Sequence, residues 1–316
     1  MASKKLSRIK QLATEQSAFL NRCGISTCKD VLTKSLVDLM NINYSHTQSL
    51  ELLKVVSRVV SPIPVTAFQL MKKHKFLTTS LSKLDDVLHG GLPAGTITEI
   101  AGPPGCGKTQ FCIMMSAVTA LQSGSNVVYI DTENAFTAKR FLEIVKIKVG
   151  PVNHDQIALD IASKVIVYLE STCESLLERL NILEDVIINK KVDLIILDSV
   201  ASLARKEFGH QAVLTDRNEM LMRQAAKLKY YAETFNIPVL VTNQISTQVS
   251  DSEFGNVSCV TAALGNTWAH AVNSRLMVTF VNDRVRQMVV AKSPIAPPAS
   301  FCYKIDEGGI VFLSQA

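Results

Sequence analysis

The chain has 316 residues, of which 47% are hydrophobic and 19% charged, a composition typical of globular domains rather than of disordered or fibrous proteins. Its 33 basic and 28 acidic residues give a net charge of +5, too mild an excess to establish a polyanionic partner by itself. The seven cysteines form no C-x-x-C pair and the histidines do not cluster with them, which favours a reducing compartment and argues against a metal–sulfur site. No apolar run reaches the roughly 18 residues of a membrane helix, so we expect a soluble protein of the cytosol or nucleus.

Residues 1–60 show helical periodicity without strand-like alternation, which predicts a small all-helical N-terminal domain. Helices joined by tight connections at residues 23–27 and 39–44 resemble a helix-hairpin-helix module. Such modules bind a DNA phosphate through backbone N–H groups and usually carry glycine there, whereas residues 40–43 read MNIN. The resemblance therefore favours protein docking or a purely structural role of this hairpin slightly over DNA binding.

Residues 61–76 are expected to form an interdomain linker, because Pro62 and Pro64 each remove a backbone donor and bias the preceding residue away from the α region. The linker contains a basic cluster, KKHK, at residues 72–75. A solvated flank is the commoner explanation of such a cluster, and a nuclear-import or DNA-backbone patch is the less common one. The sequence leaves both explanations open.

The motif G-x-x-x-x-G-K-[ST] occurs at residues 102–109, which read GPPGCGKT. Residues 98–101 before it predict a strand, and residues 109–121 after it predict a buried helix, as a phosphate-binding P-loop requires. The glycines let backbone N–H groups converge, and the helix N-terminus adds partial positive charge, so the loop can hold a polyphosphate. Lys108 is then expected to reach the β- and γ-phosphates of ATP, and the Thr109 hydroxyl to hold Mg²⁺.

Residues 77–316 alternate between strand-like and helix-like segments, which predicts an α/β core with a mostly parallel sheet and helices on both faces. Strands are predicted at residues 98–101, 127–131, 165–169, 194–198 and 238–244, and helices at residues 135–149, 173–189 and 216–235. Short strands at residues 275–281, 287–291, 301–305 and 310–313 predict antiparallel hairpins on one sheet edge. Asp198 ends an apolar strand and is a candidate Mg²⁺ acid, with a simple capping role as the alternative.

Several motifs in a fixed order carry a family resemblance. Leu84-Asp85 and Gly90-Gly91 precede the P-loop. Three motifs follow it: YIDTE at residues 129–133, LDS at residues 197–199 and TNQ at residues 242–244. Together they resemble the RecA-like recombinases over residues 77–313, with a helical domain ahead of the ATPase core as in eukaryotes and archaea. Three segments look most like the B paralogue of the eukaryotic Rad-fifty-one group. They are the P-loop sequence GPPGCGKTQFC at residues 102–112, SVAS at residues 199–202 and ALGNTW at residues 263–268.

The resemblance implies roles for residues around the P-loop. Glu133 would orient and deprotonate the water that attacks the γ-phosphate, while Gln244 would sense that phosphate. Asp198 would act with Thr109 on Mg²⁺. The residues expected to contact ATP are Gly102, Pro103, Pro104, Gly105, Cys106, Gly107, Lys108, Thr109 and Gln110. We therefore expect an ATP hydrolase whose activity is stimulated by DNA and is low for the isolated protein.

The resemblance also implies that the loop after Leu203 and a polar loop at residues 245–262 face DNA. Arg205, Lys206 and Phe208 place two cations beside an aromatic ring, as a groove for single-stranded DNA requires. Residues 210–211 read HQ where the recombinase carries a second arginine, so weaker DNA binding is expected.

Two departures from the recombinase pattern concern assembly. The linker reads Pro64-Val65-Thr66-Ala67, which lacks the phenylalanine of the recombinase self-assembly motif and argues against long homopolymeric filaments. Lys292 stands where the recombinase carries an acid over a neighbour's nucleotide. It is either a solvent-facing lysine before a Ser-Pro turn or a catalytic cation supplied in trans.

Two function classes follow. The first is a DNA-dependent ATPase subunit of a recombination-mediator complex in the homologous-recombination repair of double-strand breaks, and the retained Glu133 favours it. The second is a nucleotide-gated assembly module whose ATP turnover is incidental. A hexameric helicase is disfavoured by the helical N-terminal domain and the terminal hairpins. The resemblance implies a nuclear protein whose partners are other paralogues of the group, the C-type above all, and single-stranded or branched DNA.

Overall fold

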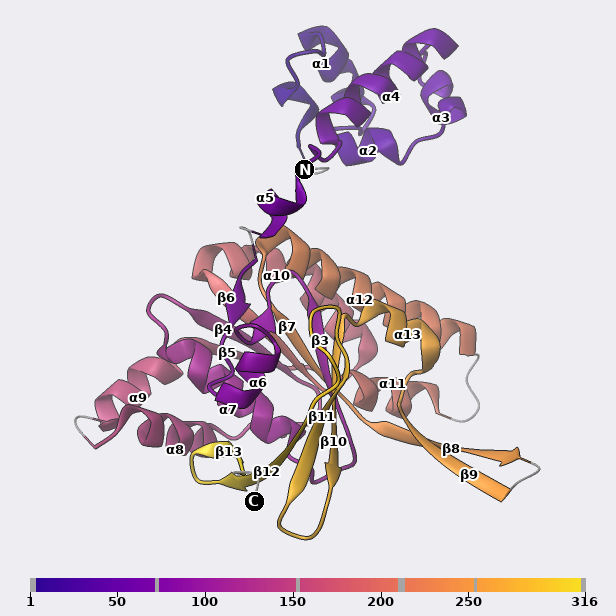
Figure 1. Cartoon of the computed structure of the whole chain (residues 1–316). Coiled ribbons are helices and arrows are strands. Elements are labelled where there is room, and N and C mark those ends of the chain that lie inside the picture. Colours follow the sequence, from indigo (N-terminus) through magenta and orange to yellow (C-terminus); the bar gives the residue numbers. More distant parts are fainter. Residues whose placement is uncertain (1–3, 72–73, 152–153, 210–213, 253–254, 314–316) are drawn as a thin grey trace. The chain divides into compact units, whose positions relative to one another are not determined.

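The computed structural model describes residues 4–71, 74–151, 154–209, 214–252 and 255–313 (Figure 1). The chain divides into two compact units, residues 1–73 and residues 74–316. Each unit has its own hydrophobic core.

The first unit is helical, as the periodicity predicted, and the only strand-type pairing in its described part is an isolated bridge between Lys5 and Thr27. Its elements are η1 (Leu6–Arg8), α1 (Thr14–Arg22), α2 (Cys28–Leu32), α3 (Leu36–Asn41), α4 (His46–Val60) and α5 (Ala67–Met71). Capping boxes begin three of these helices, because Thr27, Ser35 and Ser45 each exchange hydrogen bonds with the residue three positions later. These boxes fix the short connections between helices, so that Leu39 and Val56 are buried in one small core.

The second unit is built on a nine-stranded sheet in the order β13-β12-β11-β10-β3-β7-β6-β4-β5. Its strands are β3 (Ile97–Ala101), β4 (Asn126–Asp131), β5 (Val165–Leu169), β6 (Val192–Asp198), β7 (Val239–Asn243), β10 (Ser274–Phe280), β11 (Arg286–Lys292), β12 (Ser300–Asp306) and β13 (Gly309–Phe312). The strands from β10 through β3 to β5 are parallel, and β10 to β13 are antiparallel. The predicted fold class, a mostly parallel sheet with antiparallel edge hairpins, is confirmed.

Helices cover both faces of this sheet (Figure 1). They are α6 (Ser82–Val87), α7 (Lys108–Leu121), α8 (Ala138–Val149), α9 (His154–Ala162), α10 (Cys173–Lys190), α11 (Val200–Phe208), α12 (Leu214–Phe235) and α13 (Gly265–Ala271). In β4, Val127 and Tyr129 belong to the core beneath α7 and α8, whereas Val128 and Ile130 belong to the core beneath α10 and α12. Alternate side chains of a strand point to opposite faces, so a continuous apolar run can fill two cores at once.

Two segments that were expected to be loops have regular structure, so that expectation was wrong. The segment after Leu203 continues α11, whose N-cap Ser199 accepts a hydrogen bond from the backbone N–H of Ser202. Residues 245–262 form an antiparallel hairpin of β8 (Ile245–Ser252) and β9 (Gly255–Ala262). A further short pair, β1 (Phe76–Leu77) and β2 (Leu92–Pro93), precedes the main sheet.

Candidate nucleotide site

The P-loop connects the end of β3 to the start of α7. Its backbone takes the left-handed conformation at Gly105 (φ +80°) and at Gly107 (φ +90°), which is the N-cap residue of α7. A Cβ atom on Gly107 would also lie 2.4 Å from the Ile305 side chain. The backbone angle therefore favours glycine here, and a larger residue would also require the end of the Ile305 side chain to move.

The carboxyl ends of β3, β7, β6 and β4, which are neighbours in the sheet, bring together the predicted site residues Lys108, Thr109, Glu133, Asp198 and Gln244. A cavity of about 340 Å³ lies at this edge. Its lining comprises Pro104, Gly105, Gly107, Lys108, Thr109, Gln110, Glu133, Asp198, Ser199, Thr242, Gln244 and Ile305. Of the site residues named from sequence, the P-loop residues Gly102, Pro103 and Cys106 do not line this cavity, and neither do Lys292 and the predicted DNA-contacting residues.

Asp198 is only 3% exposed, and burial raises the pKa of its carboxyl group. Hydrogen bonds from Thr242 (2.5 Å), Tyr129 (2.7 Å) and the Thr109 hydroxyl lower that pKa and favour the carboxylate. Carboxylate and hydroxyl oxygens are the ligands that Mg²⁺ accepts, so the Asp198 and Thr109 pair fits such an ion. Sequence reasoning did not find Tyr129 and Thr242, which hold this carboxylate.

Glu133 is held in place by the chain around it. The Asp131 carboxylate accepts hydrogen bonds from the backbone N–H groups of Glu133 (3.0 Å) and Phe136 (2.8 Å), which shapes the turn after β4. The Ser199 hydroxyl donates to Oε1 of Glu133 at 2.8 Å. These bonds aim the carboxylate into the cavity, where a general base must stand to reach a water molecule.

The Lys108 ammonium lies in the loop that it is expected to serve. Its Nζ donates to the carbonyl oxygens of Gly102 and Pro103, each at 2.9 Å. Burial lowers the pKa of Lys108, while the charges of Asp198 and Glu133 are among those that raise it. The ammonium is partly desolvated and close to two carboxylates, so added phosphate charge would interact with it strongly.

Comparison with known proteins agrees with this geometry. A family model described as Rad51 matches residues 71–312, and one described as XRCC3/RpoA-like, helix-hairpin-helix domain matches residues 6–60. The chain belongs to the Rad51 family.

Relatives of this Rad51-family chain cover almost all of it. "DNA repair protein RAD51 homolog 2" of Homo sapiens is 44% identical over 98% of the chain and 89% of the relative. The Mus musculus protein of the same name is 42% identical over 98% of both chains. "DNA repair and recombination protein RadA" of Cenarchaeum symbiosum (strain A) is 28% identical over 92% of the chain and 75% of that relative. The family is one of ATP-binding proteins of DNA repair and recombination, to which this chain's P-loop conforms.

Arg205 connects the nucleotide cavity of this Rad51-family core to the hairpin. Its guanidinium donates to Oε1 of Gln244 and, at 3.1 Å, to the carbonyl of Ile245, the first residue of β8. Arg205 also lines a second cavity, of about 720 Å³, at the base of the hairpin. Phe208 lines the same cavity, and so does Arg217 of α12, which sequence reasoning did not single out.

Lys206 is separated from Arg205 because consecutive residues of a helix point in different directions. Its Nζ donates to the carbonyl of Ser171 at 3.4 Å, and it does not line the cavity with Arg205.

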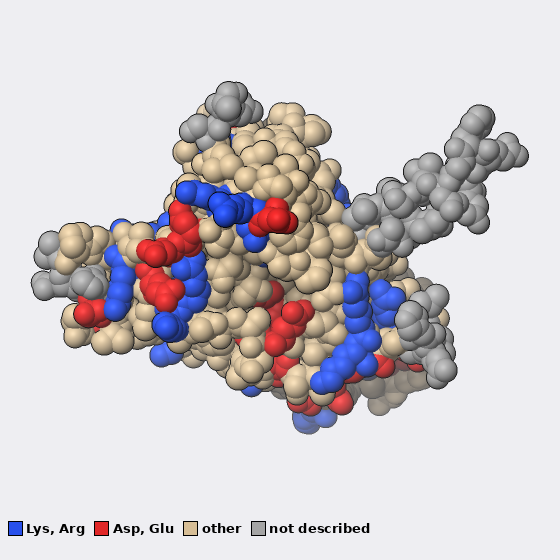
Figure 2. All heavy atoms as spheres, turned by 90° about the horizontal axis from the view of Figure 1, so that it is seen from below, with Lys and Arg blue, Asp and Glu red and all other residues tan. Residues whose placement is uncertain are grey.

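On the face drawn in Figure 2, Lys and Arg side chains form a run toward the right edge and are interleaved with Asp and Glu at the left. His210 and Gln211, Lys72 and Lys73 lie outside the described residues.

Lys292 is hydrogen-bonded within its own chain. Its Nζ donates to the carbonyls of Ala269 (2.9 Å) and Val272 (2.5 Å), at the C-terminal end of α13. A cation is favourable there because the last carbonyls of a helix carry partial negative charge. A role in trans would require Lys292 to leave these two carbonyls.

Arg140 of α8 is a further residue that sequence reasoning did not single out. Its guanidinium donates to Oε1 of Gln110 (2.8 Å) and to the carbonyls of Asp306 and Glu307. It thereby joins the helix that follows the P-loop to the turn between β12 and β13.

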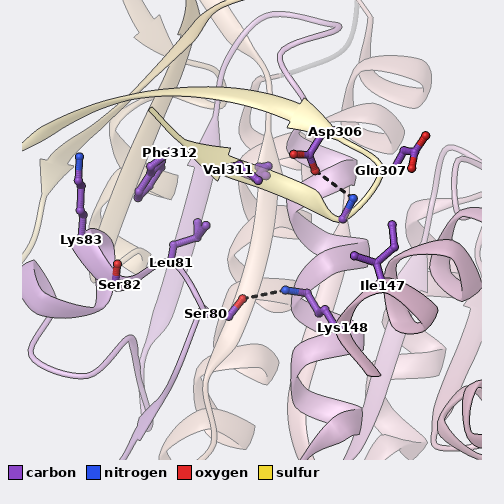
Figure 3. Close-up of a pocket in the computed structure, with 12 residues that line it drawn as sticks. Ser80, Leu81, Ser82, Lys83, Ile147, Lys148, Asp306, Glu307, Val311 and Phe312 are labelled. Atoms are coloured by element: carbon purple, nitrogen blue, oxygen red, sulfur yellow. Dashed lines mark hydrogen bonds between the residues drawn. The ribbon is translucent and has the colours of Figure 1, made fainter. Parts of the chain in front are cut away.

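A larger cavity of about 850 Å³ lies beside the same turn (Figure 3). Lys83 and Lys148 line it together with Asp306 and Glu307, and the apolar part includes Phe312. Lys148 donates to the Ser80 hydroxyl at 3.1 Å, as Figure 3 shows. None of its lining residues belongs to the P-loop, so volume alone does not identify the nucleotide site.

Among the described residues, no helix is long and apolar enough to span a membrane. The same residues contain no group of three or more His, Cys, Asp or Glu side chains arranged to hold a metal ion. The Asp198 and Thr109 pair differs from such a cluster, because phosphate oxygens and water complete the coordination of Mg²⁺ in P-loop proteins.

Proposed function

We propose that this chain is a B-type Rad51 paralogue that hydrolyses ATP as a nuclear subunit of a recombination-mediator complex in double-strand break repair. The observation that carries the proposal is the convergence of Lys108, Thr109, Glu133, Asp198 and Gln244 on one cavity at the carboxyl ends of adjacent strands. Residues from four separate segments line this cavity, and their chemistry supports a site for phosphoryl transfer.

In this mechanism the P-loop N–H groups and Lys108 bind the phosphates, and Gln244 lies where it can respond to the γ-phosphate. Mg²⁺, held by Thr109 and Asp198, would neutralise phosphate charge. Glu133, oriented by Ser199, accepts a proton from the attacking water. The reaction converts ATP and water to ADP and phosphate, and the γ-phosphate bond to the β-phosphate oxygen is the one that breaks.

We infer that single-stranded DNA binds at the base of the β8–β9 hairpin. Arg205, Arg217 and Phe208 line the cavity there, so two cations can meet phosphates while a ring meets a base. Arg205 also contacts Gln244 of the nucleotide cavity. Binding of DNA would therefore change the affinity for ATP, and binding of ATP would change the affinity for DNA. This contact gives a physical route for DNA to stimulate ATP turnover.

The test is ATP turnover with and without single-stranded DNA, for the wild type and for Arg205→Glu/Lys206→Glu. We expect DNA to stimulate the wild type and the variant to lose both the stimulation and most of the salt dependence of DNA binding. Lys206→Ala alone should have the smaller effect, because Lys206 does not line the Arg205 cavity. Equal stimulation of wild type and double variant would exclude this surface, and the basic cluster at residues 72–75 would become the candidate.

The assembly proposal rests on one edge strand of the main sheet. Strand β5 is the last strand on its side of the sheet, and its Leu169 is 65% exposed. On α10, Ile182 and Ile188 are each 57% exposed. An exposed edge strand with apolar neighbours can receive a strand from another chain. We propose another Rad51-type paralogue, the C-type first, as the partner that supplies it.

Lys292 offers a test of the mixed assembly. If Lys292 acts on a neighbour's nucleotide, Lys292→Ala should lower ATP turnover of the mixed complex and leave ATP binding by the isolated chain unchanged. Thermal unfolding of the variant is the control, because loss of the two bonds at the end of α13 would lower stability without requiring any neighbour. A mixed complex as active as the parent would reject the role in trans.

A nucleotide-gated assembly module is the second candidate, and one observation favours it. The contact of Arg205 with Gln244 and with the first residue of β8 could transmit nucleotide binding to the hairpin without hydrolysis. Under that reading, complexes assemble with ATP whether or not it is turned over. ATP turnover and complex assembly of Glu133→Gln distinguish the two candidates.

A further inference from the structure

The C-terminal antiparallel strands contact the P-loop. Arg286 of β11 and Tyr303 of β12 are directly opposite in the strand register, so their side chains lie on the same face of the sheet. Arg286 Nε donates to the carbonyl of Gly105 at 3.3 Å, and the Tyr303 hydroxyl donates to the carbonyl of Cys106 at 2.6 Å. Two neighbouring donors therefore hold two consecutive carbonyl groups of the loop.

The Tyr303 contact lies behind the loop rather than in the nucleotide cavity. Tyr303 is fully buried, and neither it nor Cys106 lines that cavity, whereas Gly105 and Gly107 do. Burial raises the pKa of Tyr303, so its hydroxyl stays protonated and able to donate at neutral pH.

The hydrogen bond restrains the orientation of the Cys106–Gly107 peptide group. The Cys106–Gly107 peptide is trans, so the carbonyl of Cys106 and the N–H of Gly107 point in opposite directions. Gly105 and Gly107 on either side of Cys106 both have positive φ, and glycine offers little resistance to rotation of the adjoining peptide. Holding the Cys106 carbonyl toward Tyr303 keeps the Gly107 N–H directed to the side where phosphate binds.

We propose that the Tyr303 hydroxyl is a positioning group that presents the Gly107 N–H to the nucleotide phosphates. The inference rests on the proposed ATP-binding function and assigns part of that function to the C-terminal hairpins. The P-loop motif alone does not specify it, because β12 follows the loop by about two hundred residues in sequence.

The chain contains a matched control for this hydroxyl. Tyr231 of α12 is also buried, and its hydroxyl also donates to a backbone carbonyl, that of Leu180 in α10. It belongs to the core on the face of the sheet away from α7. Tyr303→Phe and Tyr231→Phe therefore remove the same kind of bond, near the P-loop and far from it.

The experiment is calorimetric titration of the full chain with ATP and with ADP in the presence of Mg²⁺, together with thermal unfolding. We expect Tyr303→Phe to raise the Kd of both nucleotides about fivefold, the effect of one net hydrogen bond, because both carry a β-phosphate. Tyr231→Phe should lower the Tm about as much as Tyr303→Phe does, because each variant loses one buried hydrogen bond. It should change the Kd of either nucleotide less than about twofold.

Equal Kd values for Tyr303→Phe and the wild type would overturn the inference while leaving the proposed function intact. Equal weakening by both variants would also overturn it, since loss of stability would then explain the result. A wild-type chain that binds no nucleotide would refute the proposed function as well as the inference.

Discussion

Lys108→Ala should weaken ATP binding about 10- to 100-fold, the range expected when one or two charge-assisted hydrogen bonds to phosphate are lost. The ammonium lies at the P-loop cavity, close enough to Asp198 and Glu133 for both carboxylates to affect its pKa. Burial disfavours the charged form of Lys108, but the variant also loses the two hydrogen bonds to the carbonyls of Gly102 and Pro103, so we expect an intact fold with a modestly lower Tm. The Kd for ATP is the measurement, with far-ultraviolet circular dichroism and Tm as evidence of an intact fold.

Two controls separate the role of Lys108 from general charge effects. Lys229→Ala removes a lysine from an exposed position of α12 and should leave the Kd for ATP unchanged. Lys108→Arg keeps the charge but replaces a compact ammonium with a broad planar group, so it should restore little of the affinity. An ATP affinity of Lys108→Ala equal to that of the parent would show that the nucleotide binds elsewhere.

The strand pattern of the core was predictable because buried parallel strands are short apolar runs with few alternatives. The prediction for residues 165–169 coincides with β5, and that for residues 194–198 differs from β6 by two residues at its start. Helix α11 was missed because the family resemblance implied a loop after Leu203, whereas the chain there continues a helix that is capped by Ser199. Local pattern predicted the strands, whereas α11 combines the Ser199 cap with four residues buried in the core, namely Val200, Ala201, Leu203 and Ala204.

The candidate site was predictable only where a motif names the residue. The hydroxyls that hold Asp198 come from residues inside strands, and their position depends on register. Leu197 pairs with Val241, which places Asp198 beside Thr242. Tyr129 pairs with Ile196, two residues before Asp198 and on the same face. No pattern within either strand carries that information, because it arises from how strands distant in sequence align.

A buried network beneath the site illustrates the same limit. Glu99 of β3 is fully buried and accepts hydrogen bonds from Asn243 (2.7 Å) and Trp268 (2.8 Å), and it is paired with Arg275. A buried carboxylate with these partners is satisfied, whereas removal of one partner would leave an uncompensated charge. In sequence, Glu99 is only a polar residue within a predicted strand.

Glu133→Gln should reduce ATP turnover about 100-fold or more while ATP still binds, because the amide cannot accept the proton of the attacking water. The substitution is nearly isosteric, and the retained Oε1 can still accept the hydrogen bond from Ser199. Single-turnover hydrolysis and the Kd for ATP are the two measurements. The control for an unspecific effect of the amide is Glu178→Gln, at an exposed position of α10. This variant should match the wild type in its single-turnover rate and in its Kd for ATP.

Ser199→Ala refines the interpretation of the Glu133 result. It removes the hydroxyl that orients Oε1 of Glu133 but leaves the base, so turnover should fall by a smaller factor, about fivefold to tenfold. The Ser199 hydroxyl also accepts the N–H of Ser202, so Tm must be compared between variant and parent. If Glu133→Gln turns over ATP at the wild-type rate, Glu133 is not the general base. That result would favour the nucleotide-gated assembly module over the ATPase subunit.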